Sequence, residues 1–262
     1  MKPSRTENPL ELCCLPASAQ ETLRHYDHRV ASLLLQARDA VDPAMWEKQR
    51  RLPSAFLTHL EKAFLVYDQS LRFAQSQLHR AGWSITCAPG CSHCCTQLPS
   101  GLTGVEILYL SHGALRAGVL DRMFRRCLER LELWEEIRRW NAQDLAQACL
   151  ERSLAQRLHR YNALKVPCPF LEAGLCSLYR YRPLACRIHF SLSPPHWCRP
   201  DHFQNAHAIR FNLEPSHQVM DALERLDQVL QLNLSDLLVC GFVEWVVNVM
   251  AFRPIAWTEN PH

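Results

Sequence analysis

Apolar residues recur at helical spacing along most of the chain, and segments that alternate apolar and polar residues are rare. The segment from Pro53 to Gly82 shows the pattern clearly, with apolar side chains at Phe56, Leu60, Phe64, Tyr67 and Leu71. Steps of three or four residues place these side chains on one face of an α-helix, whereas a strand requires a period of two. The pattern therefore predicts a mainly α-helical protein.

Capping signals mark where the first helices begin. Ser18 and Glu21 have the spacing of a capping box, which predicts a helix from there to about residue 40. Asp42 followed by Pro43 is typical of an N-cap and the first residue of a helix. The next helix is expected to open at Pro53 and to end at Gly82.

A second capping box, Thr103 with Glu106, predicts a helix to about residue 117 with Gly118 as its C-cap. The charged stretch 120–164 is helical in pattern, either as one long helix or as two with a break near Asn141. Two more helices are expected over 215–230 and 235–252.

These elements predict one domain over residues 1–262. A helical flank (1–83) and C-terminal helices (201–262) enclose a cysteine-cluster core (84–200), which carries a helical insertion at 103–164. The stretch 167–200 is rich in proline and lacks a regular pattern, so a bound metal would supply a constraint that it otherwise lacks. We therefore expect helical flanks that clamp an irregular, cysteine- and proline-rich metal-binding core.

Eight of the thirteen cysteines lie in two blocks of that core. The first block has the spacing C-x3-C-x2-C-C, and in the second block seven, nine and eleven residues separate successive cysteines. Thiolates grouped in this way are typical of zinc and iron–sulfur sites. Because the second block contains no close pair, one site drawing on both blocks, or a cluster needing many thiolates, fits best. The predicted ligands are Cys87, Cys91, Cys94, Cys95, Cys168, Cys176, Cys186 and Cys198.

The remaining cysteines are interpreted as small buried hydrophobic residues. They are Cys13, Cys14, Cys127, Cys149 and Cys240.

Several histidines lie near the cysteines or near one another. His93 and His189 could each replace a cysteine as a ligand, and a hydrogen-bonding role beside the site is the plainer interpretation. His25 and His28 lie one helical turn apart, and we expect them on a helix surface.

Two arginines flank Cys186, and both are predicted to lie around the bound group. A four-thiolate zinc site or an iron–sulfur cluster carries net negative charge, and guanidinium groups donate well to sulfur. Arg182 and Arg187 are therefore the candidate cofactor-binding residues.

The sequence favours an iron–sulfur cluster, with zinc as the alternative. The number of clustered thiols exceeds the four that a single zinc ion needs. Side chains of adjacent residues diverge, so Cys94 and Cys95 serve a polynuclear centre more easily than one ion.

Three motifs resemble the YkgJ-like cysteine-cluster proteins. They are C-x3-C-x2-C-C at 87–95, G-L-T-x2-E at 101–106, and P-C-P-F-L-x-A-G-x-C-S-x-Y-x2-R-P-x2-C-R at 167–187. That family carries a zinc- or iron-chelating CxxCxxCC domain, and the flagellin lysine N-methylases are related to it. The resemblance covers residues 84–200 and implies metal ligation by every clustered cysteine except Cys198. The first spacing here differs slightly from the family's own.

Charge and hydropathy narrow the function further. The net charge is +3 and arginines alternate with glutamates, so we expect no nucleic-acid surface. The apolar run Leu237 to Phe252 is too short to span a membrane and contains Glu244. The first nine residues lack a signal-peptide pattern, and clustered thiols suit a reducing compartment, so we expect the cytoplasm.

The sequence leaves three classes of function open for the metal site. The leading hypothesis is a metal-binding cysteine-cluster protein with a structural, redox or catalytic role. One alternative is an enzyme resembling the S-adenosylmethionine-dependent protein-lysine methylases, although the chain shows no Gly-rich strand–turn–helix for the methyl donor. Another is a metal-handling adaptor that binds a protein partner.

Overall fold

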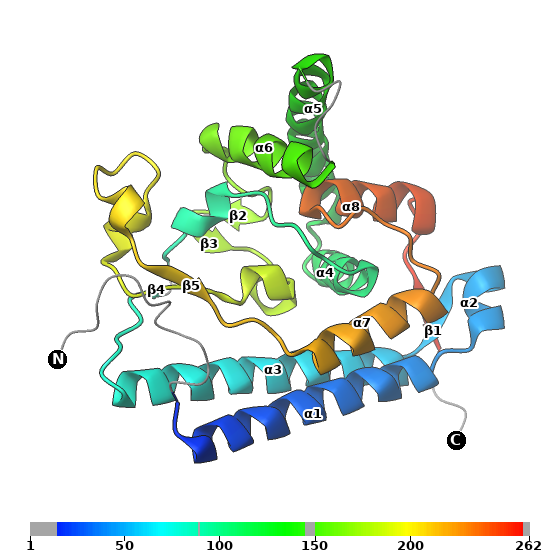
Figure 1. Ribbon diagram of the computed structural model, residues 1–262. Helices are drawn as coiled ribbons and strands as arrows, with labels where there is room; N and C mark the ends of the chain where they lie inside the picture. Colours follow the sequence, from blue (N-terminus) through cyan, green and yellow to red (C-terminus); the bar gives the residue numbers. More distant parts are fainter. Residues whose placement is uncertain (1–14, 89, 145–149, 259–262) are drawn as a thin grey trace.

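The structure is a computed structural model that describes residues 15–88, 90–144 and 150–258. Helices make up most of it, as the spacing of apolar residues predicts (Figure 1). They are α1 (Ala17–Asp39), α2 (Pro43–Gln49), α3 (Ser54–Arg80), α4 (Gly104–Arg116), α5 (Leu120–Asp144), α6 (Leu150–Ala163), α7 (His217–Val229) and α8 (Leu238–Glu244), which continues into a π-helical turn, Trp245–Val249.

Strands in the described part of the chain form three short pairs. β1 (Arg51–Pro53) and β6 (Ala256–Thr258) pair in parallel, which joins segments far apart in sequence. β2 (Leu171–Glu172) and β3 (Leu175–Cys176) form an antiparallel hairpin, as do β4 (His189–Ser191) and β5 (Arg210–Asn212). β2, β3 and β4 lie in the stretch 167–200 that was predicted to be irregular, together with several short 3₁₀ turns, whereas β5 lies beyond it.

The helices form two layers with α4 between them. α1 and α3 run side by side, and α7 packs on α1 to complete one layer (Figure 1). α8 and α5 form the other side, and α6 packs on α5. Every residue of α4 from Gly104 to Ala114 is buried. This central helix therefore links the helical flanks to the cysteine-containing loops.

Two of the predicted helix starts are confirmed. The Asp42 carboxylate accepts hydrogen bonds from the backbone N–H groups of Ala44 (2.9 Å) and Met45 (3.1 Å). The Glu106 carboxylate accepts from the N–H (2.8 Å) and the hydroxyl (2.9 Å) of Thr103. Gly118 has a φ of +66°, the conformation expected of a glycine just past a helix C-terminus.

Other boundaries differ from the predicted ones. α1 begins at Ala17 after Pro16 and has no side-chain cap, so Ser18 already lies inside the helix and the first capping box is wrong. The stretch 120–164 contains two helices, with α5 passing Asn141. The last predicted helix begins later than expected, at Leu238, and its end is π-helical.

The apolar run near the C-terminus packs in the interior of the protein. Leu238, Val239 and Phe242 are buried, as are Trp245 and Val246. Within the part of the chain that the structure describes, no helix has both the length and the apolar character needed to cross a membrane.

Candidate metal centre

The first cysteine block is an extended loop that ends in a 3₁₀ turn, His93–Thr96. The loop is anchored at Thr86, whose N–H donates to the carbonyl of Ser191 (2.9 Å) and whose hydroxyl donates to that of Ser193. Gly90 has a φ of +90°, so the loop turns through a conformation that suits glycine best. This anchoring already joins the first block to the segment that leads to Cys198.

The second cysteine block lies directly against the first. The N–H of Cys168 donates to the carbonyl of Cys95 at 2.7 Å. The 3₁₀ turn Pro195–Cys198 packs against the turn that carries Cys94 and Cys95. The two blocks, which the long insertion separates in sequence, therefore come together in the fold.

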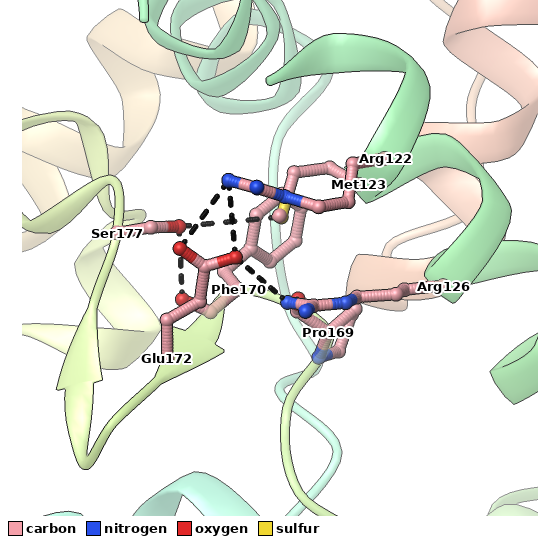
Figure 2. Close-up of polar contacts among 7 residues, drawn as sticks. All are labelled: Arg122, Met123, Arg126, Pro169, Phe170, Glu172 and Ser177. Atoms are coloured by element: carbon pink, nitrogen blue, oxygen red, sulfur yellow. Dashed lines mark hydrogen bonds and ion pairs between the residues drawn. The ribbon is translucent and has the colours of Figure 1, made fainter.

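Helix α5 holds the hairpin that carries Cys176. Figure 2 shows the Arg126 guanidinium between the Pro169 carbonyl (3.2 Å) and the Glu172 carboxylate (3.0 Å), with Arg122 on the same carboxylate. The Ser177 hydroxyl donates to the carbonyl of Phe170 at 3.0 Å and closes the hairpin. The helical insertion therefore supports the second block.

The neighbouring thiols raise one another's pKa. Burial raises the pKa of Cys87 to about 11, and the thiols of Cys91, Cys94 and Cys198 act in the same direction. Burial also raises the pKa of Cys168 to about 12, with Cys176 and Cys94 adding to it.

Cys186 and Cys94 follow the same pattern. Burial holds the pKa of Cys186 well above its ordinary value, and Cys168, Cys176 and Cys94 raise it further. The pKa of Cys94 is raised first by its hydrogen bond to Cys95 and then by burial. Thiolates at these positions would repel one another, because each raises the pKa of its neighbours.

Arg182 is one of the two arginines predicted to lie near a bound metal. Burial and neighbouring groups raise the pKa of Cys94, Cys176 and Cys186, and the positive charge of Arg182 offsets part of that rise. Its guanidinium stacks 3.6 Å from the ring centroid of Tyr179. Its Nε is buried and has no hydrogen-bond partner among the described residues. This N–H is available to an anionic acceptor.

Arg187 has a different principal contact from the predicted one. Its side chain is 1% exposed, and its Nη1 lies 2.6 Å from both carboxylate oxygens of Asp68 on α3. It also donates to the carbonyls of Arg182 (2.8 Å) and Arg180 (2.6 Å). Burial raises the pKa of Cys176, and the Arg187 charge offsets part of that rise. The hydrogen bonds of Arg187 fix the shape of the loop.

The structure shows side-chain contacts for two of the four histidines singled out in the sequence, His28 and His189. The ring Nδ1 of His189 lies 2.5 Å from the side-chain oxygen of Asn212, across the β4–β5 pair. His25 and His28 are exposed on α1, as predicted, and His28 contacts Gln218 of α7 at 3.2 Å. His93 lies in the turn beside Cys94, and its carbonyl accepts from the Thr96 hydroxyl.

Two residues that support the site were not predicted to do so. Glu106 is 1% exposed, and its second carboxylate oxygen accepts from the Leu184 N–H at 2.6 Å. This bond ties the 3₁₀ turn Leu184–Cys186 to α4. The capping-box spacing identified Glu106, but a contact so distant in sequence leaves no local signal.

The second residue that was not predicted to lie near the site is Cys127 of α5. It is fully buried, and the Cys168 thiol contributes to its raised pKa, after burial. Helical spacing predicted that Cys127 is a core residue, but it could not reveal that Cys127 lies near Cys168. Cys240 is also buried, as predicted, whereas Cys13, Cys14 and Cys149 lie outside the described residues.

As the side chains stand, no three His, Cys, Asp or Glu residues within 15–88, 90–144 and 150–258 are arranged to hold a metal ion. Ligation would require the thiols to turn toward a common centre, as coupled binding and folding allows. Comparison with protein-family models, curated proteins and solved structures found no match. Membership of the YkgJ-like family therefore stays a prediction.

Proposed function

We propose that the chain is a metal-binding cysteine-cluster protein whose metal lies where the two cysteine blocks meet, as an iron–sulfur cluster or as zinc. The observation that carries the proposal is the hydrogen bond from the Cys168 N–H to the Cys95 carbonyl. It brings two cysteine-rich loops from distant parts of the chain into contact, and their thiols influence one another's pKa.

The surrounding residues suit such a site. α4 holds the Cys186 turn through Glu106, and α5 holds the Cys176 hairpin through Arg126. Arg182 supplies a positive charge that acts on thiols from both blocks, and its Nε has no hydrogen-bond partner among the described residues. Such groups orient thiolate ligands and offset their charge.

The number of thiols favours iron–sulfur over a single zinc ion. An iron–sulfur cluster would supply electron transfer, and zinc would supply structural cross-linking. In either case the chain's own residues hold the loops together. The supporting contacts of Glu106, Arg126 and Arg182 are the same for both metals.

Anaerobic purification of the full chain tests the proposal. We expect a brown protein that contains iron and acid-labile sulfide and loses its colour in air, or a colourless protein with stoichiometric zinc. The Cys91→Ser/Cys186→Ser variant should lose the metal, and Cys240→Ala should keep it as a matched control. Protein that folds normally but takes up neither iron nor zinc would contradict the proposal.

A further inference from the structure

We propose that the loop over residues 194–209 is a docking surface for a folded protein partner, one that offers an apolar pocket bordered by carboxylates. This segment, called the Phe203 loop below, makes up most of the connection between β4 and β5. It lies at the periphery of the molecule, beyond the β4–β5 pair (Figure 1). The inference concerns a partner and does not depend on whether the chain holds a metal.

The Phe203 loop exposes apolar side chains that folding does not use. Phe203 is 81% exposed, more than any other large apolar side chain in the described part of the chain, and Ile209 is 45% exposed. Trp197 of the same loop is only half-buried, and none of the three belongs to the hydrophobic core. Their burial therefore does not stabilise the folded chain, and a partner is what would cover them.

Hydrogen bonds give this loop its shape. The N–H of His202 donates to the carbonyl of Arg199 (3.0 Å), and the N–H of Asn205 donates to that of His202 (2.9 Å). The Asn205 side-chain amide donates to the carbonyls of Trp197 (3.1 Å) and Arg199 (2.9 Å), and Arg210 donates to the Asn205 carbonyl (2.9 Å). The segment is thus a compact surface loop, a form that is often functional.

The ring of Phe203 is also held in place. It stacks on the ring of His202 with centroids 4.7 Å apart, and His202 packs on His196 at 5.0 Å. The Nδ1 of His202 accepts from the N–H of Gln204 at 3.1 Å, which fixes the imidazole. Because the ring is positioned before any partner arrives, binding costs little conformational entropy.

The charges of the loop indicate the kind of surface that would receive it. Its one carboxylate, Asp201, is already paired with Arg199, at 2.9 and 3.3 Å. Arg210, at the base of the loop, makes no ion pair within the described part of the chain. Aromatic rings and arginine are enriched at protein interfaces, and here they occur without an unpaired carboxylate. A pocket bordered by carboxylates is the complementary surface.

Two other occupants fit less well. Binding to a membrane surface requires a broad apolar face or several cations together, and the loop offers one strongly exposed ring and few charges. The apolar cavity between α1, α3, α7 and Leu184 is lined by side chains that are all buried, so it gives Phe203 of a second copy no open pocket. A protein interface, in contrast, is commonly dominated by a single rigid aromatic side chain within a polar rim.

The Phe203 loop begins beside the first cysteine block. The 3₁₀ turn Pro195–Cys198 packs on the turn His93–Thr96, and the Thr86 hydroxyl donates to the carbonyl of Ser193 just before the loop. A docked partner would therefore lie next to the cysteine blocks.

Photo-crosslinking of the full-length chain identifies the partner. The photoreactive amino acid p-benzoylphenylalanine is placed at position 203 in one protein. In the matched control it is placed at position 252, where Phe252 of another segment is 65% exposed. We expect a protein that crosslinks at position 203 and not at position 252. That protein is then purified and its affinity for the parent chain is measured by isothermal titration calorimetry.

Variants of the chain then test how the purified partner is bound. Phe203→Ala should weaken the affinity by at least about tenfold, because an aromatic anchor dominates such an interface. Phe252→Ala should leave the affinity unchanged. Asn205→Ala, which loosens the loop but keeps the ring, should weaken it by a smaller factor. Added salt should also weaken binding. Urea unfolding should give Phe203→Ala the stability of the parent, which separates a lost contact from a lost fold.

Several results would overturn the proposal. One is the same set of crosslinked proteins at positions 203 and 252, or none at position 203 above the control. Another is a purified partner that binds Phe203→Ala as tightly as the parent. Crosslinks between two copies of the chain would assign the loop to self-association. Phe203-dependent sedimentation with vesicles of phosphatidylcholine and phosphatidylserine would assign it to a membrane, and either result would replace the protein partner.

Discussion

Glu106 and Arg187 are buried charged residues that hold the loop around Cys186 from two sides. The Glu106 carboxylate accepts three hydrogen bonds, and the Arg187 guanidinium donates to Asp68 and to two backbone carbonyls. A charge is tolerated inside a protein only when it is satisfied in this way. Through these bonds, α4 and α3 hold the loop that carries Cys186 in a fixed position.

Arg187→Lys should strongly destabilise the protein. Lysine keeps the charge but lacks the planar set of N–H donors that reaches Asp68 and the carbonyls of Arg180 and Arg182 together. Weakening a buried ion pair in this manner should cost about 3 kcal/mol in the free energy of unfolding. Urea unfolding of parent and variant measures the difference.

Arg199→Lys is the matched control, because its ion pair with Asp201 is half exposed on both sides. It should change stability little. Equal effects of the two substitutions would contradict the structural role given to Arg187.

The buried carboxyl group of Asp227 should make the stability of the protein depend on pH. Its carboxylate accepts from the N–H groups of Gly104 (2.6 Å) and Val105 (2.7 Å), the start of α4. Burial raises its pKa from 3.8 to about 6, and Glu106 and Glu224 contribute in the same direction. The folded state thus binds a proton more tightly than the unfolded state, so this contribution to stability is present below pH 3.8 and is lost as the pH rises through about 6.

Asp227→Asn should remove that dependence, because asparagine is neutral at every pH. Relative to the variant, the parent should lose about 3 kcal/mol of stability at most between acid and neutral pH. Thermal unfolding of both proteins from pH 4 to pH 7 measures this difference, with exposed Asp221→Asn on the same helix as control. A difference that does not vary with pH would contradict the raised pKa.

At the scale of elements, the sequence predicted those features of a helix that depend on residues close together in the chain. Asp42 and Glu106 were identified as capping residues because an N-cap acts over three positions. The bonds from α4 to Asp227 could not be predicted, since that carboxylate comes from α7. The parallel β1–β6 pair and the π-helical turn at Trp245 likewise depend on contacts between distant segments.

The contact between α4 and the Tyr179–Tyr181 turn depends on a glycine within the helix. A Cβ added at Gly113 would lie 2.3 Å from Cγ of Tyr181, well inside van der Waals contact. The Tyr181 ring also packs on Tyr109, with centroids 5.0 Å apart. The turn can therefore approach α4 closely only because residue 113 has no side chain.

Gly113→Ala should destabilise the protein although alanine favours helices. The clash should cost about 2–3 kcal/mol, against a gain of about 1 kcal/mol in helix propensity. Removing the ring by Tyr181→Ala should reduce this cost but not abolish it, because the Tyr181 Cβ would still lie 2.8 Å from the added methyl group. A double-mutant cycle in urea measures the reduction. A Gly113→Ala variant that is more stable than the parent would contradict the close packing.

At the scale of the whole molecule, the ligand set stays a prediction, and the arrangement of the two cysteine blocks could not be predicted from the sequence. Thiol clustering is visible in the spacing of residues 87–95, and the helical flanks follow from apolar periodicity. The contact between the turn that ends at Cys198 and the turn His93–Thr96 lies near the Thr86 bonds to Ser191 and Ser193, which join segments about a hundred residues apart. Only the tertiary structure shows that the helical insertion, α5 in particular, supports the second block.

The long loops between the helices should make metal and fold depend on each other. The segment that carries Cys186 has little regular structure and is held to α4 and α3 by Glu106 and Arg187. A metal that cross-links it to the first block stabilises the folded state by its own binding free energy, because the unfolded chain has no preformed site.

Cys186→Ser should therefore abolish or weaken metal binding and lower the unfolding temperature of the metal-bound protein markedly. The metal-free parent and metal-free Cys186→Ser should differ by only about 1 kcal/mol, the cost of replacing a buried thiol by a hydroxyl, so most of the loss should depend on the metal. Cys240→Ala, at a buried cysteine of α8, should lower stability by about 1 kcal/mol in both forms, since it only removes a small core side chain. Differential scanning calorimetry of parent and variants, with and without chelator, separates the two effects. A Cys186→Ser variant whose stability loss is the same with and without metal would show that Cys186 is a core residue and not a ligand.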